Sequence, residues 1–195
     1  MNNEKKMVTL HQIFSEHIQT IEETERSLKP AIAEFAQNVR QALANGNTVF
    51  FMGNGGSAAD SQHLAAEFVG RFQKERKGLA SVALTTDTSI LTAVGNDYGF
   101  DKVFSRQVEA LVKPGDVVVG LSTSGNSLNV VTALEAAKVA GAITVGMTGC
   151  GGGKMAELCH LCISVPAKVT ARIQETHILI GHIVCQLVDA EAESV

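Results

Sequence analysis

The chain has 195 residues, of which 45% are apolar and 18% charged, and its formal net charge is −4. The length suits one domain, and the apolar fraction is sufficient for a sizeable core, which argues against a disordered chain. The acidic balance offers no basic surface for a phosphate backbone, so we expect no nucleic-acid partner. We predict a single domain over residues 1–195.

The cysteines and the hydropathy of the chain indicate the cellular compartment in which we expect the protein. The first residues carry charges with no long apolar stretch behind them, and no run of about 18 apolar residues occurs, so we expect neither a signal peptide nor a membrane span. A chain of this size does not need disulfides, and we expect reduced thiols and a cytoplasmic protein. The four cysteines are Cys150, Cys159, Cys162 and Cys185.

The first 45 residues predict two helices. An apolar stripe runs through residues 8–28, and Pro30 is placed to open a second helix that continues through Leu43 and ends at Asn45-Gly46. We expect this N-terminal helical pair to pack on the domain or on a neighbouring subunit.

Apolar runs alternate with helical patterns beyond residue 46. The predicted strands are residues 48–52, 81–85, 116–122, 142–148 and 161–165. The predicted helices are residues 58–71, 88–95, 101–112, 128–140 and 172–190. Four of the strands are continuously apolar, which is typical of a parallel sheet covered on both faces. The fold class is therefore α/β, a doubly wound five-stranded parallel sheet, in which ligands bind beyond the carboxyl ends of the strands.

A glycine-rich loop, GNGGSAAD at residues 53–60, follows the first strand. Ser57 is a good helix N-cap with Asp60 three residues later, and the helix N-terminus behind it is suited to an anion. A tight turn without a ligand is the plain alternative. The letters also fit a dinucleotide motif, but that motif needs an acidic residue about 20 positions on, and Asp87 lies 34 residues after Gly53.

A second loop, STSGNS at residues 122–127, also follows a buried strand and opens a helix. Its hydroxyls and backbone N–H groups can bind a phosphate monoester without fixed positive charge. One such loop could be an ordinary turn, but two at strand ends of one sheet favour a phosphorylated small molecule.

Polar side chains line one face of the helix over residues 58–71. His63 and Glu67 lie one turn apart, a spacing that can hold a divalent metal, although a solvated ion pair is the usual explanation. The C-terminal helix is apolar nearly all round, which predicts burial or a subunit interface. Gln174 and His182 in this helix could share one ion if both reach inward or come from different subunits; a core histidine is the alternative for His182.

The remaining histidines and the cysteine pair are given structural roles. His11, His17, His160 and His177 have no matching partners in the sequence. Cys159-x-x-Cys162 overlaps an apolar strand and has no second CxxC, so a metal or redox role is disfavoured.

The motifs taken together carry a family resemblance. GNGGSAAD-x-QH-x-AAEF-x-x-RF, LT-x-x-GND-x-GF, LSTSGNS, GGKM and RIQE-x-H…GHI resemble the SIS-domain family of phosphosugar isomerases, over residues 46 to 190. Within it they are most similar to the branch that isomerises sedoheptulose 7-phosphate. The resemblance implies a homotetramer with active sites between subunits. It also implies conversion to D-glycero-D-manno-heptose 7-phosphate, the first step toward ADP-heptose for lipopolysaccharide core or related glycans.

The resemblance also implies a site. Glu67 and His182 would be the acid–base pair. Zinc would be bound by His63, Glu67, Gln174 and His182. The substrate would contact Asn54, Gly55, Gly56, Ser57, Glu67, Asn96, Asp97, Ser122, Thr123, Ser124, Ser127 and Gln174.

Two rival functions stay open at this point. Some SIS-domain proteins of this size are non-catalytic tetramers that bind the replication initiator, but those lack the glutamate and the last histidine that stand here as Glu67 and His182. Isomerases of other phosphosugars, such as arabinose phosphate, usually carry additional regulatory domains.

Overall fold

The computed structural model describes residues 3–191. Its centre is a five-stranded parallel sheet in the order β2-β1-β3-β4-β5. The strands are β1 (Val49–Gly53), β2 (Ser81–Ala83), β3 (Val117–Ser122), β4 (Ile143–Thr148) and β5 (Leu161–Ser164). All five strands fall where the apolar runs predicted them. β1, β3 and nearly all of β4 are buried, as a continuously apolar run in a parallel sheet is, whereas the edge strands β2 and β5 are only partly buried.

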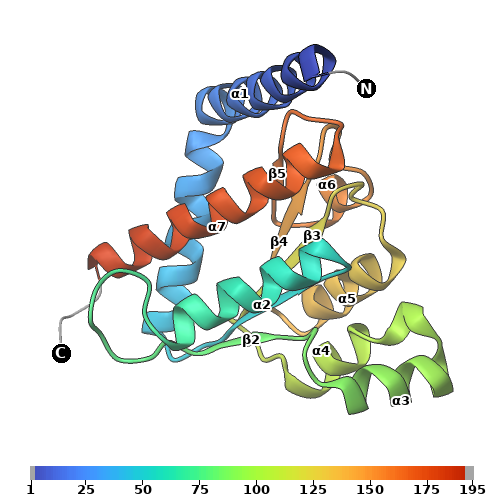
Figure 1. Cartoon of the computed structure of the whole chain (residues 1–195). Coiled ribbons are helices and arrows are strands. Elements are labelled where there is room, and N and C mark those ends of the chain that lie inside the picture. The colour runs from blue at the N-terminus through green and yellow to red at the C-terminus, as the bar shows by residue number, and fades with distance from the viewer. Residues whose placement is uncertain (1–2, 192–195) are drawn as a thin grey trace.

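The helices cover both faces of the sheet (Figure 1). They are α1 (Asn3–Ala44), α2 (Gly56–Val69), α3 (Thr88–Tyr98), α4 (Ser105–Leu111), α5 (Leu128–Val139), α6 (Met155–Leu158) and α7 (Thr170–Glu191), with a 3-10 turn at Phe100–Lys102. Neighbouring strand residues serve opposite faces: Phe51 packs in the core under α1, α2 and α7, and Phe50 in the core under α4 and α5. The doubly wound α/β architecture is confirmed; the short α6 was not predicted.

The N-terminal helical pair is a wrong prediction. α1 is one helix from Asn3 to Ala44, and Pro30 lies inside it. Figure 1 shows that the helix changes direction along its length, as expected where proline removes a backbone hydrogen bond and crowds the preceding turn. Burial of Ile32, Phe35 and Val39 against the sheet stabilises the turns that follow the proline.

None of the helices in the described part of the chain combines the length and the hydropathy that a membrane span requires. The four cysteines are free, and Cys150 is the exposed one. Burial is the main cause that raises the pKa of Cys159 and of Cys185, each to about 12, so both thiols stay protonated at neutral pH.

Candidate functional site

The register of the sheet brings the two predicted loops together. Gly53 at the end of β1 pairs with Leu121 near the end of β3. Gly53 is held close: a Cβ there would lie 2.9 Å from the Leu121 carbonyl oxygen. One residue on, the side-chain amides of Asn54 and Asn129 exchange two hydrogen bonds of 2.9 Å. Asn129, at the start of α5, was not singled out by the sequence, and it ties the glycine-rich loop to the helix that follows the hydroxyl loop.

The STSGNS loop gathers hydroxyl groups at one point. The Ser122 hydroxyl lies 2.9 Å from that of Ser127 and 3.4 Å from that of Ser124. Ser127 is the N-cap of α5, yet its side chain makes no capping bond. Gly125 has a positive φ of 65°, and a Cβ there would lie 2.0 Å from the Gly152 carbonyl oxygen. The loop is thus packed tightly against residues 149–154, with its hydroxyls near the first turn of α5, as an oxyanion site requires.

The glycine-rich loop departs from the sequence prediction in one detail. α2 begins at Gly56 with Gly55 as its N-cap, so Ser57 lies in the first turn and is not the cap. Ser57 is buried. The Asp60 side chain has one buried oxygen without a hydrogen-bond partner, and burial, opposed by His63, raises the pKa of its carboxyl group. A half-buried carboxyl group therefore borders the site.

Three of the four predicted metal ligands converge where α2 meets α7. The Nε2 atom of His63 lies 3.1 Å from Glu67 Oε1 and 3.1 Å from His182 Nε2. The ligand atoms of all three residues lie within 4.8 Å of one another. Burial, and then the neighbouring His63, lowers the pKa of His182, although Glu67 opposes the shift. His182 is consequently a neutral imidazole at neutral pH, which can ligate a metal or accept a proton.

Several residues outside the predicted site hold this cluster in place. Gly181 lets the helices approach: a Cβ there would lie 2.3 Å from Leu64 Cδ2. The Phe72 ring stacks on the His182 ring with centroids 5.3 Å apart. Arg76 and Asp189 form a buried ion pair of 2.6 Å, and Arg76 also donates to the Glu67 carbonyl oxygen at the end of α2.

The other predicted site residues fall into two groups. Gln174, near the start of α7, lies against the glycine-rich loop, since a Cβ on Gly56 would lie 2.6 Å from its amide nitrogen. Asn96 and Asp97 are exposed on α3 and hydrogen-bond to each other at 2.8 Å. α3 packs on the core of the opposite face from α7. Gln174 therefore contacts the glycine-rich loop, whereas the side-chain hydrogen bond of Asn96 goes to Asp97 and reaches no other predicted site residue.

Three of the remaining histidines contact other parts of the chain. His177 is buried, and its Nε2 atom lies 3.0 Å from the Thr148 carbonyl oxygen at the end of β4. Burial lowers the pKa of His177 to about 4. His160 Nδ1 accepts from the Thr144 backbone N–H at 3.0 Å. Both fit the structural role expected of them, whereas His17 contacts Glu175 in the first turns of α7.

Comparison with known proteins places this site in a family. The model of the SIS domain matches residues 12–149. The chain belongs to the SIS-domain family. A phosphoheptose isomerase from Rhodospirillum rubrum is 62% identical over 160 residues, which cover 82% of this chain and 85% of that protein.

Two solved structures agree over almost the whole chain. A phosphoheptose isomerase from Neisseria gonorrhoeae has a TM-score of 0.88 and 47% identity, covering 95% of this chain and 98% of that one. One from Francisella tularensis has a TM-score of 0.92 and 35% identity, covering 95% and 99%. Within the SIS family, this chain is thus grouped with the phosphoheptose isomerases.

Proposed function

We propose that the chain is an aldose–ketose isomerase that converts sedoheptulose 7-phosphate into D-glycero-D-manno-heptose 7-phosphate. The observation that carries the proposal is the meeting of His63, Glu67 and His182 in one cluster between α2 and α7. Both helices pack on the sheet whose strands end in the two loops suited to a phosphate group. Relatives that are 62% and 60% identical, each over more than four fifths of this chain, bear the name phosphoheptose isomerase. The non-catalytic alternative is disfavoured because a binding scaffold has no need of this cluster.

The residues present can perform the chemistry. The isomerisation moves a proton between C1 and C2 through an enediol and exchanges protons between O1 and O2. Glu67 and His182 supply a carboxylate and a neutral imidazole, one to take the carbon-bound proton and the other to serve the oxygens. The hydroxyls of Ser122, Ser124 and Ser127, with the free N–H groups of α5, would hold the phosphate end.

We also propose that zinc binds at this cluster. The donor set fits, because two imidazole nitrogens and a carboxylate whose atoms converge within 4.8 Å are ligands that zinc prefers. Gln174, near the start of α7, would be the fourth ligand of the ion. When bound, the ion would act as a Lewis acid toward the sugar oxygens and stabilise the negative charge that develops there.

Assembly and cellular context complete the proposal. We place the enzyme in the cytoplasm as a homotetramer, on the route to ADP-heptose for lipopolysaccharide core or a related glycan. Two surfaces support assembly. α3, which carries Asn96 and Asp97, buries none of its residues. The N-terminal part of α1 exposes large apolar side chains, namely Met7, Val8, Leu10, Ile13, Phe14 and Ile18.

The decisive experiment is incubation with sedoheptulose 7-phosphate, with and without a chelator, followed by re-addition of zinc. We expect turnover that the chelator abolishes and zinc restores. Turnover that resists the chelator would remove the metal from the proposal but leave the isomerase. A folded protein with no turnover under any of these conditions would overturn the isomerase and favour the scaffold. Light scattering tests the tetramer, and an active monomer would contradict it.

A further inference from the structure

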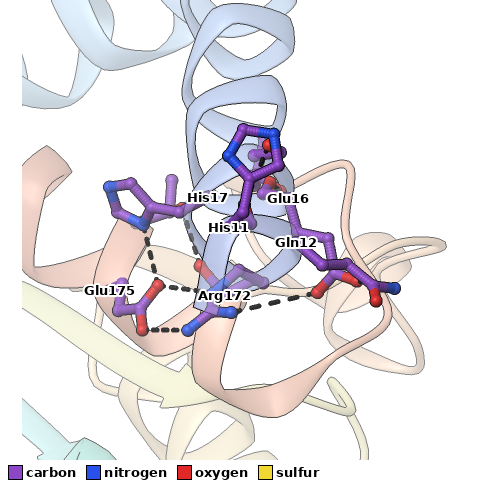
Figure 2. Close-up of polar contacts among 9 residues, drawn as sticks. His11, Gln12, Glu16, His17, Arg172 and Glu175 are labelled. Carbon is purple, nitrogen blue, oxygen red and sulfur yellow. Dashed lines mark hydrogen bonds and ion pairs between the residues drawn. The ribbon is translucent and has the colours of Figure 1, made fainter. Parts of the chain in front are cut away.

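A charged cluster joins α1 to the first turns of α7 (Figure 2). Arg172 Nε donates to Glu175 Oε2 at 2.6 Å, and Arg172 Nη2 donates to the other carboxylate oxygen. From α1, His17 Nδ1 lies 2.8 Å from Glu175 Oε2, and Glu16 Oε2 lies 4.0 Å from Arg172 Nη1. Residues of α1 and α7 separated by more than 150 positions are thus bonded directly.

The cluster is more than an exposed ion pair. The Arg172 side chain is 11% exposed, and its planar fork binds both oxygens of one carboxylate, the geometry in which a charge-assisted pair is strongest. The Arg172 hydrogen bonds are the largest cause that lowers the pKa of Glu175, so the carboxylate stays charged at neutral pH. His17 then donates to an oxygen already fixed by Arg172, which orders α1 and α7 against each other.

Gln174 lies between these two cluster residues in sequence but contacts another part of the molecule. Successive residues of a helix are turned by about 100°, and here Glu175 meets α1 while Gln174 meets Gly56 in the glycine-rich loop. Helix ends fray unless something holds them. Two residues after Glu175, His177 binds the end of β4. The first two turns of α7 are therefore held by α1 on one side and by the glycine-rich loop on the other.

We propose that His17 and Glu175 are positioning residues for the isomerisation: by fixing the first two turns of α7 to α1, they keep the Gln174 amide at the glycine-rich loop. The inference rests on the proposed function, because Gln174 matters there as a ligand of zinc and of the substrate. It gives α1 a part in the active site, although α1 itself supplies none of the predicted site residues.

The test compares two variants with two matched controls. His17→Gln and Glu175→Gln remove the contact between helices while keeping side chains of similar size. His11→Gln changes an exposed histidine of the same helix, and Glu109→Gln breaks an exposed Arg106–Glu109 pair with the same three-residue spacing. The measurements are kcat and KM, the zinc affinity of the apoprotein, the midpoint of unfolding, and amide hydrogen exchange at residues 170–177.

Loss of a residue that orients a metal ligand costs about 10-fold to 100-fold in affinity or activity. We expect each of the two variants to lose about tenfold in kcat and in zinc affinity, with faster exchange confined to the first turns of α7. The double variant should be little worse than either single one, because both act through one contact. The controls should match the wild type, and Glu175→Asp should restore part of the loss.

Two kinds of result would overturn the inference. Unchanged kcat and zinc affinity in both variants would show that the contact does not position Gln174. Losses that follow a general fall in the unfolding midpoint, or that add up in the double variant, would reduce the cluster to a structural role. If the wild type itself fails to turn over the sugar, the proposed function fails; zinc affinity and exchange still test the positioning role separately.

Discussion

The strand-end loops and α3 both carry predicted substrate contacts, but the rest of the chain fixes the loops and leaves α3 exposed. The loops are fixed from within: Ser122 bonds to Ser127, and Asn54 bonds to Asn129. α3 buries none of its residues, and Asn96 and Asp97 are exposed. Parallel-strand register positions the loops wherever the sheet forms, whereas nothing in the described chain covers the exposed face of α3. We therefore predict that the loops serve their own chain and that α3 serves a second copy.

The largest effect is expected at the cluster of His63, Glu67 and His182, where α2 meets α7. Glu67→Gln removes a base and weakens a ligand, and His182→Asn removes an imidazole that can accept, donate or ligate. Each change should lower kcat for sedoheptulose 7-phosphate by at least about 10²-fold, the usual scale for one general acid–base group. Activity is measured alongside zinc content and circular dichroism.

Folding is the necessary control for those two variants. Neither side chain belongs to the apolar core, so both variants should keep the far-UV spectrum of the wild type. A folded Glu67→Gln protein with near-full activity would remove Glu67 from the mechanism.

The second prediction tests whether α3 serves a neighbour. Asp97→Ala and Glu67→Gln should each be poorly active alone, and co-expression of the two with different tags should regain activity in mixed oligomers. Regain occurs because a subunit with intact Glu67 can meet a subunit with intact Asp97. The matched control is Glu67→Gln mixed with His182→Asn, which damage the same single-chain cluster and should not complement. Mixed oligomers no better than their parents would place Asp97 in its own chain's site.

The sequence predicted the sheet well because each strand coincides with an apolar run. The positions of the two loops could then be predicted from the ends of the strands. The contacts that hold the His63, Glu67 and His182 cluster in place could not be predicted in this way. Arg76 and Asp189 are 113 positions apart and belong to no local motif. Phe72 lies in a loop, and the sequence alone does not indicate that its ring stacks on the ring of His182. Such contacts follow from the packing of α2 on α7, which composition and spacing do not encode.

At Pro30 the error was of the opposite kind, because a local sequence rule predicted a helix boundary that the structure does not have. Proline favours the first turn of a helix, so the local rule placed a boundary there. The structure continues the helix because apolar residues on both sides of Pro30 pack on the core, among them Leu28 before it and Ile32 after it. Tertiary burial outweighed the local cost, which is about 3 kcal/mol or more for an interior proline.

A smaller effect is expected at the phosphate end of the site. Replacing Ser122 and Ser124 with alanine removes two of the clustered hydroxyls and should raise KM about tenfold, as the loss of one or two hydrogen bonds to a charged group would. Zinc content should stay unchanged. Ser27→Ala, an exposed serine on α1, is the control. Loss of metal with an unchanged KM would mean that the loop and the cluster bind the opposite ends of the sugar.

The smallest effect concerns His177, which anchors α7 to the sheet end next to the loops. Its pKa is lowered by burial from 6.5 to about 4, so the unfolded chain binds a proton there before the folded chain does. The stabilising contribution is therefore complete above pH 6.5 and is lost as the pH falls toward 4. His177→Gln keeps a donor for the Thr148 carbonyl but cannot titrate. The difference in unfolding free energy, wild type minus variant, should fall by about 1 kcal/mol between about pH 7 and about pH 5.5. Taking this difference cancels the titrations shared by both proteins, and a difference that stays constant across that interval would show that His177 is not buried in its neutral form.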